Sequence, residues 1–259
     1  MNIDFHTHGK LAKKLPFSTQ YTDQMFHKAY LRGLDAICLT EHFNTLSFLE
    51  MYDYIYTHYT HVGDCCQSKD GLLIFFGMEI DIKEGGHTLV IGRYHDIVEL
   101  NKKLEKHKTK ESFLTFDELV TLVRQYDVIF GGAHVYRQGG HIPELSQKQL
   151  LCFDFFDLNG KDLACYGLKM QDMIYQFAHR YHKPVVSGSD THQATQYGCV
   201  QTCFQSCFHS IKQLREEIDK GQYTIQISES LNIQVEDATL QKRLLKEVYR
   251  LGGDYVALL

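Results

Sequence analysis

The sequence has little of what marks linkers or disulfide frameworks. Its 259 residues include only three prolines, and no Gly/Ser-rich or charged linker divides them. We therefore expect a single domain over residues 1–259. The eight cysteines show no CxxC spacing of the kind that binds metal, and a disulfide framework is not expected at this length. Free thiols in a reduced cytoplasm are the simplest interpretation.

Long apolar runs and an excess of basic charge are also missing. No apolar run approaches the ~20 residues that cross a bilayer. The first residues carry an aspartate and two histidines, which does not resemble a signal peptide. The formal charge is −5 with mixed signs along the chain. These features predict a cytoplasmic protein with no membrane partner, and they argue against non-specific nucleic-acid binding.

Strand-like apolar runs alternate with amphipathic, helix-like runs, which predicts an α/β fold with parallel strands and crossover helices, either a doubly wound sheet or a barrel. The expected strands are 2–5, 34–40, 72–80, 87–92, 128–135, 153–159, 185–190, 202–208 and 223–228. The expected helices are 23–33, 52–59, 115–126, 168–182, 210–221 and 239–253.

Histidines and carboxylates recur where these strand-like runs end. His6 and His8 lie two residues apart in an extended segment, so both side chains should point to one side. His87 precedes its apolar run, and we expect it to approach from a loop. A barrel places its active site at the carboxyl ends of its strands. The whole set comprises His6, His8, His42, Glu79, His87, His134, Asp190 and His192.

A metal site is the economical explanation of this set. One histidine beside an apolar strand is usually an ordinary hydrogen-bonded residue. Eight such groups brought together would repel or lose their charge unless cations held them. Most remaining histidines lie beside polar neighbours and are taken as ordinary, and His141 is ambiguous. The ordinary ones are His27, His58, His61, His95, His107, His179, His182 and His209.

Six short motifs in a fixed order resemble the polymerase and histidinol phosphatase (PHP) family. They are FHTH, TEH, GMEI followed by GGH, GAHV, DLNG and SGSDTH, between about residues 3 and 192. Residues 201–225 are similar to the segment that completes such domains, here expected at about 195–259. The resemblance implies a distorted (β/α)7 barrel that holds two or three divalent metal ions, zinc, manganese or iron, and hydrolyses phosphate esters.

The resemblance also implies a ligand set. His6, His8, Glu79 and Asp190 would bind one metal, and Glu79 would bridge to a second metal completed by His87 and His134. His42 and His192 would belong to a third.

At the position where the family supplies a further ligand to that third metal, the sequence has a lysine, taken as Lys14. A protonated ammonium has no lone pair to donate. The protein would then be binuclear, with His42 and His192 binding weakly or contacting substrate. Lys14 would either anchor a phosphate group or be an ordinary solvated lysine.

The implied chemistry uses a hydroxide that bridges two metals, with Glu79, Asp190 and His192 as the catalytic residues. Asp157 in FDLNG would orient a histidine. Arg137 and Lys161 follow site-bearing strand ends and are candidates, with Lys14, for binding the substrate's anionic group.

Several alternatives stay open at this point. An amidohydrolase also begins with His-x-His, but the pairing of Asp190 with His192 and the place of Glu79 before His87 favour a phosphoesterase. A small-molecule phosphomonoesterase is the first hypothesis. Histidinol phosphate is one candidate substrate, and a nuclease or nucleotide phosphoesterase is another possibility. A non-catalytic domain that binds metal or a phosphorylated ligand is the alternative from a different class.

Overall fold

A nearly closed barrel forms the centre of the molecule. The computed structural model describes all 259 residues, and its strands join in one 11-stranded sheet. The barrel wall has the order β1 (Asn2–Thr7), β2 (Ala36–Leu39), β5 (Leu73–Asp81), β6 (His87–Gly92), β7 (Ile129–Ala133), β8 (Phe155–Asn159) and β9 (Val185–Gly188).

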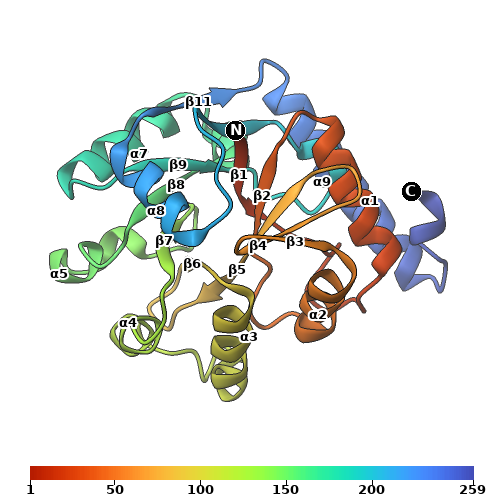
Figure 1. Ribbon diagram of the computed structural model, residues 1–259, viewed down its shortest axis with the longest axis horizontal. Helices are drawn as coiled ribbons and strands as arrows, with labels where there is room; N and C mark the ends of the chain where they lie inside the picture. Colours follow the sequence, from red (N-terminus) through yellow and green to blue (C-terminus); the bar gives the residue numbers. More distant parts are fainter.

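The segment after β9 returns to β1 and narrows the remaining gap. The Asp190 amide donates to the His6 carbonyl at 2.7 Å, and Thr7 forms a parallel bridge with Thr191. The expected α/β barrel is therefore confirmed (Figure 1).

One strand of the wall is reversed. β6 runs antiparallel to both β5 and β7, so the expectation of uniformly parallel strands is wrong here. Residues 82–86 join β5 to β6 as a hairpin, too short for a crossover helix. Gly85 and Gly86 supply its positive φ angles, +92° and +113°. His87 is consequently the first residue of a strand, paired with Asp81, and does not approach from a loop.

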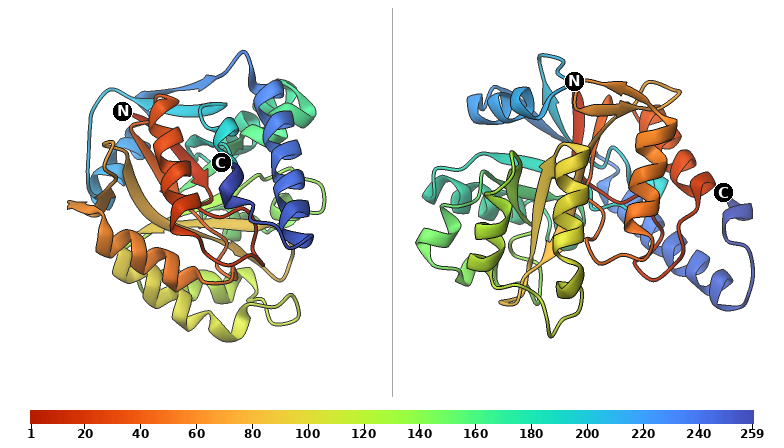
Figure 2. Two further views of the ribbon diagram at one scale, coloured as in Figure 1. Left: turned by 90° about the vertical axis from the view of Figure 1, so that its right-hand side faces the viewer. Right: turned by 60° about the horizontal axis from the view of Figure 1, so that its bottom comes forward.

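Helices surround the barrel, as Figures 1 and 2 show. The described helices are α1 (Thr19–Leu31), α2 (Phe48–His58), α3 (Tyr94–Lys103), α4 (Phe116–Val123), α5 (Gln147–Leu150), α6 (Gly160–Tyr166), α7 (Lys169–Arg180), α8 (Ile211–Lys220) and α9 (Leu231–Arg250). The sequence reasoning missed α3, α5 and α6, and it began the last helix eight residues too late, at 239. None of these helices combines the length and apolar character needed to cross a membrane.

Two buried apolar clusters divide the core. The larger lies between the outer face of the wall and the helices. The smaller fills the barrel interior with residues such as Ile3, Phe75, Ile91 and Phe155, and α8 extends it through Ile211. Ile3, Phe75 and Phe155 lie in the first half of their parallel strands, and Ile91 lies near the carboxyl end of the reversed strand β6, opposite the start of β7. Apolar side chains therefore fill one half of the barrel, and the opposite half is left for polar groups.

Further strands extend the wall at its edge. β10 (Val200–Phe204) pairs antiparallel with the start of β1, and β11 (Tyr223–Ile227) pairs with β10. β10 ends at Phe204, earlier than the expected strand over 202–208. A hairpin of β3 (Thr60–Val62) and β4 (Cys65–Gln67), not predicted, pairs with β5.

Candidate metal centre

The residues singled out at the strand ends meet in the polar half of the barrel. Three sets of side chains hold one donor atom each within 4.8 Å of one another. His42 and His87 are partly buried and the others are buried. The sets are His6, His8 and Asp190; Glu79, His87 and His134; and His8, His42 and His192.

A β-bulge in β1 turns both N-terminal histidines into this half. Asp4 of β1 pairs with Ile37 of β2, and Thr7 pairs with Leu39. Between these two pairs β1 advances by three residues and β2 by only two, which defines the bulge. Phe5 then contacts Phe155 with ring centroids 6.0 Å apart, and His6 Nδ1 lies 3.1 Å from Asp157 Oδ2. Since Phe155 and Asp157 share one face of β8, two consecutive residues of β1 both point inward.

Two of the candidate ligands have an unusual backbone conformation. His134, directly after β7, has φ +28°, and Asp190, after β9, has φ +55°. Non-glycine residues rarely adopt positive φ, and such strain concentrates at functional sites. At these positions it turns the side chain at a strand end toward the barrel axis.

The charges of the cluster favour metal ligation. Burial opposes ionisation of Glu79, but His42, His87 and His6 hold the pKa of its carboxyl well below the usual range. Asp190 is also buried, and Lys161 and Arg137 hold the pKa of its carboxyl well below its usual value. Both carboxylates are thus ionised at neutral pH, as metal ligands must be.

The imidazoles divide into two kinds. Burial lowers the pKa of His42 and of His134 to about 4, and it lowers the pKa of His192 well below its usual value. These rings are neutral and have a free lone pair at pH 7. Although burial opposes it, Glu79 raises the pKa of His6 well above the usual range and that of His87 to about 10. The carboxylate cluster therefore favours positive charge at its centre.

Buried donor atoms without partners support a metal at this position. His6 Nε2, His42 Nδ1 and Glu79 Oε2 have no hydrogen-bond partner. The last two atoms lie 2.7 Å apart but are not aligned for a hydrogen bond. Buried polar atoms are normally satisfied. Nitrogen and carboxylate donors facing one another fit zinc, manganese or iron.

Carboxylates behind the histidines fix their orientation. Asp157 contacts His6 Nδ1 at 3.1 Å, which leaves Nε2 facing the cluster, as the sequence reasoning expected of Asp157. Glu41 Oε1 lies 3.4 Å from His8 Nδ1, and Asp81 Oδ1 lies 3.0 Å from His87 Nε2. Glu41 and Asp81 were not predicted in these roles, although each is adjacent to or two residues from a candidate ligand in the sequence.

Two of the three cationic residues predicted to bind substrate contact the cluster, and the third does not. Arg137 Nη1 and Lys161 Nζ contact Asp190 at 2.6 and 3.0 Å. Lys14 is exposed and is absent from the histidine cluster; it lines a cavity of about 600 Å³ with Lys13. The group that includes His42 and His192 is completed by His8, whose ring stacks on that of His192 at 4.0 Å.

A further cation was missed by the sequence reasoning. Lys242 on α9 is half-buried, and burial together with the positive charge of Lys161 lowers the pKa of its ammonium to about 8. The negative charges of Asp190 and Glu41 raise the pKa of Lys242, but they do not outweigh burial and Lys161. A helix at the other end of the chain thus adds a positive charge beside the cluster. No local sequence pattern marks this lysine among the neighbouring ones.

Comparisons with known proteins agree with this architecture. A family model described as PHP-associated matches residues 171–223, which run from within α7 to the first residue of β11 and include Asp190 and His192. The structure of PsfC from Pseudomonas syringae PB-5123 is similar over 94% of this chain and 98% of that one, with a TM-score of 0.76 and 17% identity. Together with the family model, this fold is consistent with a member of the PHP-domain family.

Other solved structures share the PHP fold over most of the chain. The lesion-specific endonuclease Q of Pyrococcus furiosus has a TM-score of 0.64 and 19% identity over 86% of this chain, which spans only 57% of that enzyme. The similarity to a protein of Bifidobacterium adolescentis, assigned as a metal-dependent phosphoesterase, extends over 85% of this chain and 96% of that one. The similarity to an amidohydrolase of Chromobacterium violaceum extends over 90% of this chain and 97% of that one.

The last two structures both have TM-scores of 0.50 and 13% identity. No curated protein matches the sequence. At these identities the solved structures show the fold of the PHP domain, and its chemistry has to be argued from the site.

Proposed function

We propose that this PHP-domain protein is a metal-dependent hydrolase of phosphate esters whose substrate is a small phosphomonoester. The placement of the two Glu79 oxygens carries the proposal. Oε1 lies 3.0 Å from His134 Nε2, and Oε2 lies 2.7 Å from His42 Nδ1 and 3.6 Å from His6 Nε2. One carboxylate therefore faces two sets of nitrogen donors, as a bridging ligand does in a two-metal site.

Divalent metals bound by these groups would supply Lewis-acid charge that acidifies water and stabilises the phosphoryl oxygens. The chain's own cations complete the site. Arg137 is oriented by Asp162 and Asn159, both at 2.8 Å, and its third contact is to Asp190. With Lys161, it places fixed positive charge beside Asp190, where it binds a phosphoryl oxygen and holds the ester for attack.

The cavity beside the cluster supports a small substrate. Lys13 Nζ lies 3.3 Å from Asp81 Oδ2, and Asp81 in turn contacts His87. Lys13 and Lys14 line the cavity of about 600 Å³, so Lys13 and Asp81 connect this cavity to the cluster, although none of the candidate metal ligands lines it. This volume is within the range of small-molecule sites. The non-phosphate part of the substrate would occupy this cavity, with a polar or anionic group near Lys14.

A nuclease activity is the second candidate, because the PHP fold of this chain is shared with a lesion-specific endonuclease. The net charge of −5 favours the small substrate over a long nucleic acid.

The first test is phosphate release by manganese-loaded protein from histidinol phosphate, an aryl phosphate and a nucleotide, with strand cleavage of an abasic DNA duplex measured in parallel. We expect release from one or more monoesters. Cleavage of the duplex without phosphate release would establish the nuclease instead. Bound metal with neither product would identify a non-catalytic metal-binding domain.

Substitutions then locate the site. Asp190→Asn and His8→Ala should each lower turnover by roughly 100-fold or more, because both remove donors that position the reaction. Their far-UV circular dichroism should stay that of the wild type. His27→Ala is the matched control, since His27 is exposed and pairs only with Asp70. Wild-type rates in both site variants would contradict the assigned centre.

A further inference from the structure

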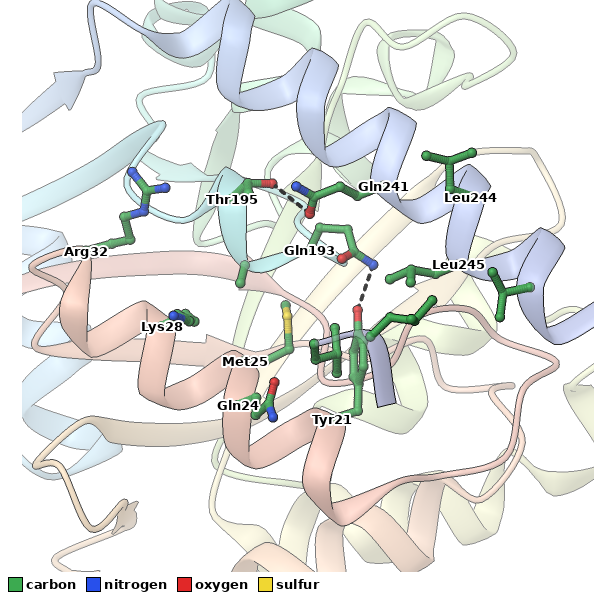
Figure 3. A pocket seen from close by; sticks show the side chains of 14 residues that line it. Tyr21, Gln24, Met25, Lys28, Arg32, Gln193, Thr195, Gln241, Leu244 and Leu245 are labelled. Atoms are coloured by element: carbon green, nitrogen blue, oxygen red, sulfur yellow. Dashed lines mark hydrogen bonds between the residues drawn. The ribbon is translucent and has the colours of Figure 1, made fainter. Parts of the chain in front are cut away.

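A second cavity lies outside the metal centre, between α1, α9 and the last residues of the chain. It has a volume of about 530 Å³, which is within the range of sites for small ligands. Figure 3 shows its lining side chains directed toward one another from α1, from α9 and from the segment after His192. Three separate parts of the chain therefore form the cavity, which is not a shallow depression on a single helix.

The two ends of this cavity differ in polarity. Lys28 and Arg32 line one end, and Leu244, Leu245 and Val248 line the other, as Figure 3 shows for the labelled residues. Leu244 is 54% exposed and Leu258, which also lines the cavity, is 63% exposed. Large apolar side chains left open to solvent beside a cavity indicate an apolar group that covers them.

No salt bridge neutralises the two exposed cations at one end of the cavity. Lys28 lies in the last turn of α1 and Arg32 is the C-cap four residues later, a spacing at which like charges repel. Neither forms a salt bridge within the chain, although Lys13 and Arg137 do so elsewhere. None of the side chains that line the cavity is acidic. An anionic group is the complement that this end lacks.

The cavity also touches the segment that carries His192. Gln193 Nε2 donates to Tyr21 Oη at 2.8 Å, and Tyr21 Oη donates to the His192 carbonyl at 2.5 Å. Tyr21 and Gln193 both line the cavity. An occupant would therefore contact the two residues that hold the backbone of a candidate metal ligand.

We propose that this cavity binds a soluble small molecule with an anionic head and an apolar body. The head lies between Lys28 and Arg32, and the body covers Leu244, Leu245 and Leu258. The occupant is separate from the phosphate ester proposed above, because this cavity shares no lining residue with the candidate metal ligands or with the cavity assigned to that ester.

Octanoate is the probe for this proposal. The control compounds are 1-octanol, which lacks the anionic head, and acetate, which lacks the apolar body. Isothermal titration calorimetry should show saturable binding of octanoate, and at least tenfold weaker binding of both others. In ¹H–¹⁵N NMR spectra, octanoate should shift the side-chain amide of Gln193. Equal binding of octanol, no binding of octanoate, or shifts confined to other regions would overturn the proposal.

Two charge variants separate this site from general electrostatics. The double variant Lys28→Ala, Arg32→Ala should weaken octanoate binding at least tenfold. The matched control, Lys102→Ala with Lys106→Ala, removes two exposed lysines that are also four residues apart but lie outside the cavity. Equal weakening in both double variants would contradict the proposed place of the head group.

A variant at the apolar end tests the body of the ligand. Leu244→Glu changes an exposed residue, so its unfolding temperature should stay near that of the wild type. It should nevertheless weaken octanoate binding because it adds negative charge and removes apolar contact. Unchanged affinity in this folded variant would overturn the proposed orientation. Binding to anionic lipid vesicles in place of monomeric octanoate would identify a membrane surface and also overturn the proposal.

Discussion

At the residue scale, the centre depends on very close backbone approach between β9 and β1. Gly188 has no side chain at the point where His6 passes. A Cβ there would lie 2.2 Å from His6 Cβ and 2.9 Å from Asp157 Oδ1. Glycine is needed because both neighbours belong to the hydrogen-bonded pair that orients His6. The residue with no functional group is thus the one that allows two functional groups to meet.

Gly188→Ala should therefore impair the centre without touching a metal donor. We expect a loss of about 1–3 kcal/mol in the free energy of unfolding, since overpacking displaces β9 from β1. Metal affinity should fall roughly 10- to 100-fold as His6 loses its alignment with Asp157. Urea unfolding and metal titration measure the two effects.

Gly140→Ala is the control, because its new Cβ would meet the Arg137 carbonyl at 3.2 Å and Gly86 Cα at 3.9 Å, and no other atom within 4 Å. Metal affinity as high as that of the wild type in Gly188→Ala would show that His6 does not depend on this approach.

At the element scale, α9 packs against the barrel and also carries a lysine near the metal-ligand cluster. Leu231, Val235 and Ala238 are buried on one face of it. Lys242, one turn beyond them, is half-buried with Lys161 as its main charged neighbour. Amphipathic periodicity explains the buried face. It does not explain why a lysine of this helix is held near another cation. Asp190 and Glu41 offset this repulsion, and an anion bound beside the two lysines would offset it further.

Lys242 should therefore assist substrate binding in its charged form. Its pKa of about 8 is below that of an ordinary lysine, so the charge is present at pH 7 and is lost as the pH rises above 8. KM for an anionic ester should increase through this range in the wild type. In Lys242→Met, KM should already be raised at pH 7 and should show no further rise of this origin.

Lys246→Met is the matched control, since Lys246 is exposed on the same helix. Steady-state kinetics between pH 6.5 and 9 distinguish the variants. A KM that is independent of Lys242 at every pH would exclude this lysine from substrate binding, whereas a change in kcat alone would point to a different role.

At the scale of the whole molecule, the cluster joins strands from both ends of the chain. His6 and Asp190 are brought together where the barrel closes, and Glu79 on β5 lies 3.6 Å from His6. Without a cation, ionised carboxylates and imidazoles with raised pKa values share one buried volume. A metal that binds only the folded chain should therefore stabilise the entire barrel.

Removal of metal by a chelator should lower the unfolding temperature. At a free metal concentration 100 times Kd the expected stabilisation is about 2.7 kcal/mol, or roughly 5–10 °C for a chain of this size. Differential scanning calorimetry with and without chelator measures it. The His8→Ala variant should lose most of this difference. An identical unfolding temperature in both conditions would contradict a metal site in the barrel.

The sequence by itself determined the fold class and the kinds of donor at the strand ends, because strand and helix periodicity and short motifs are local properties. The alternation of apolar runs predicted an α/β fold, either a doubly wound sheet or a barrel. The order of the motifs indicated the PHP family, which implied the barrel; the fold and the family resemblance were both confirmed. The convergence of the named histidines with Glu79 and Asp190 follows from the same logic, since the carboxyl ends of neighbouring strands meet.

Only the tertiary structure decided how these groups face one another. The bulge in β1 depends on its pairing with β2, and the reversal of β6 depends on a hairpin between β5 and β7. The approach of Lys242 depends on where α9 packs, and the second cavity exists only where α9 meets α1. Each is a contact between distant segments, which local propensity does not encode. Packing of the whole chain sets them, because there the burial of apolar surface outweighs local preference.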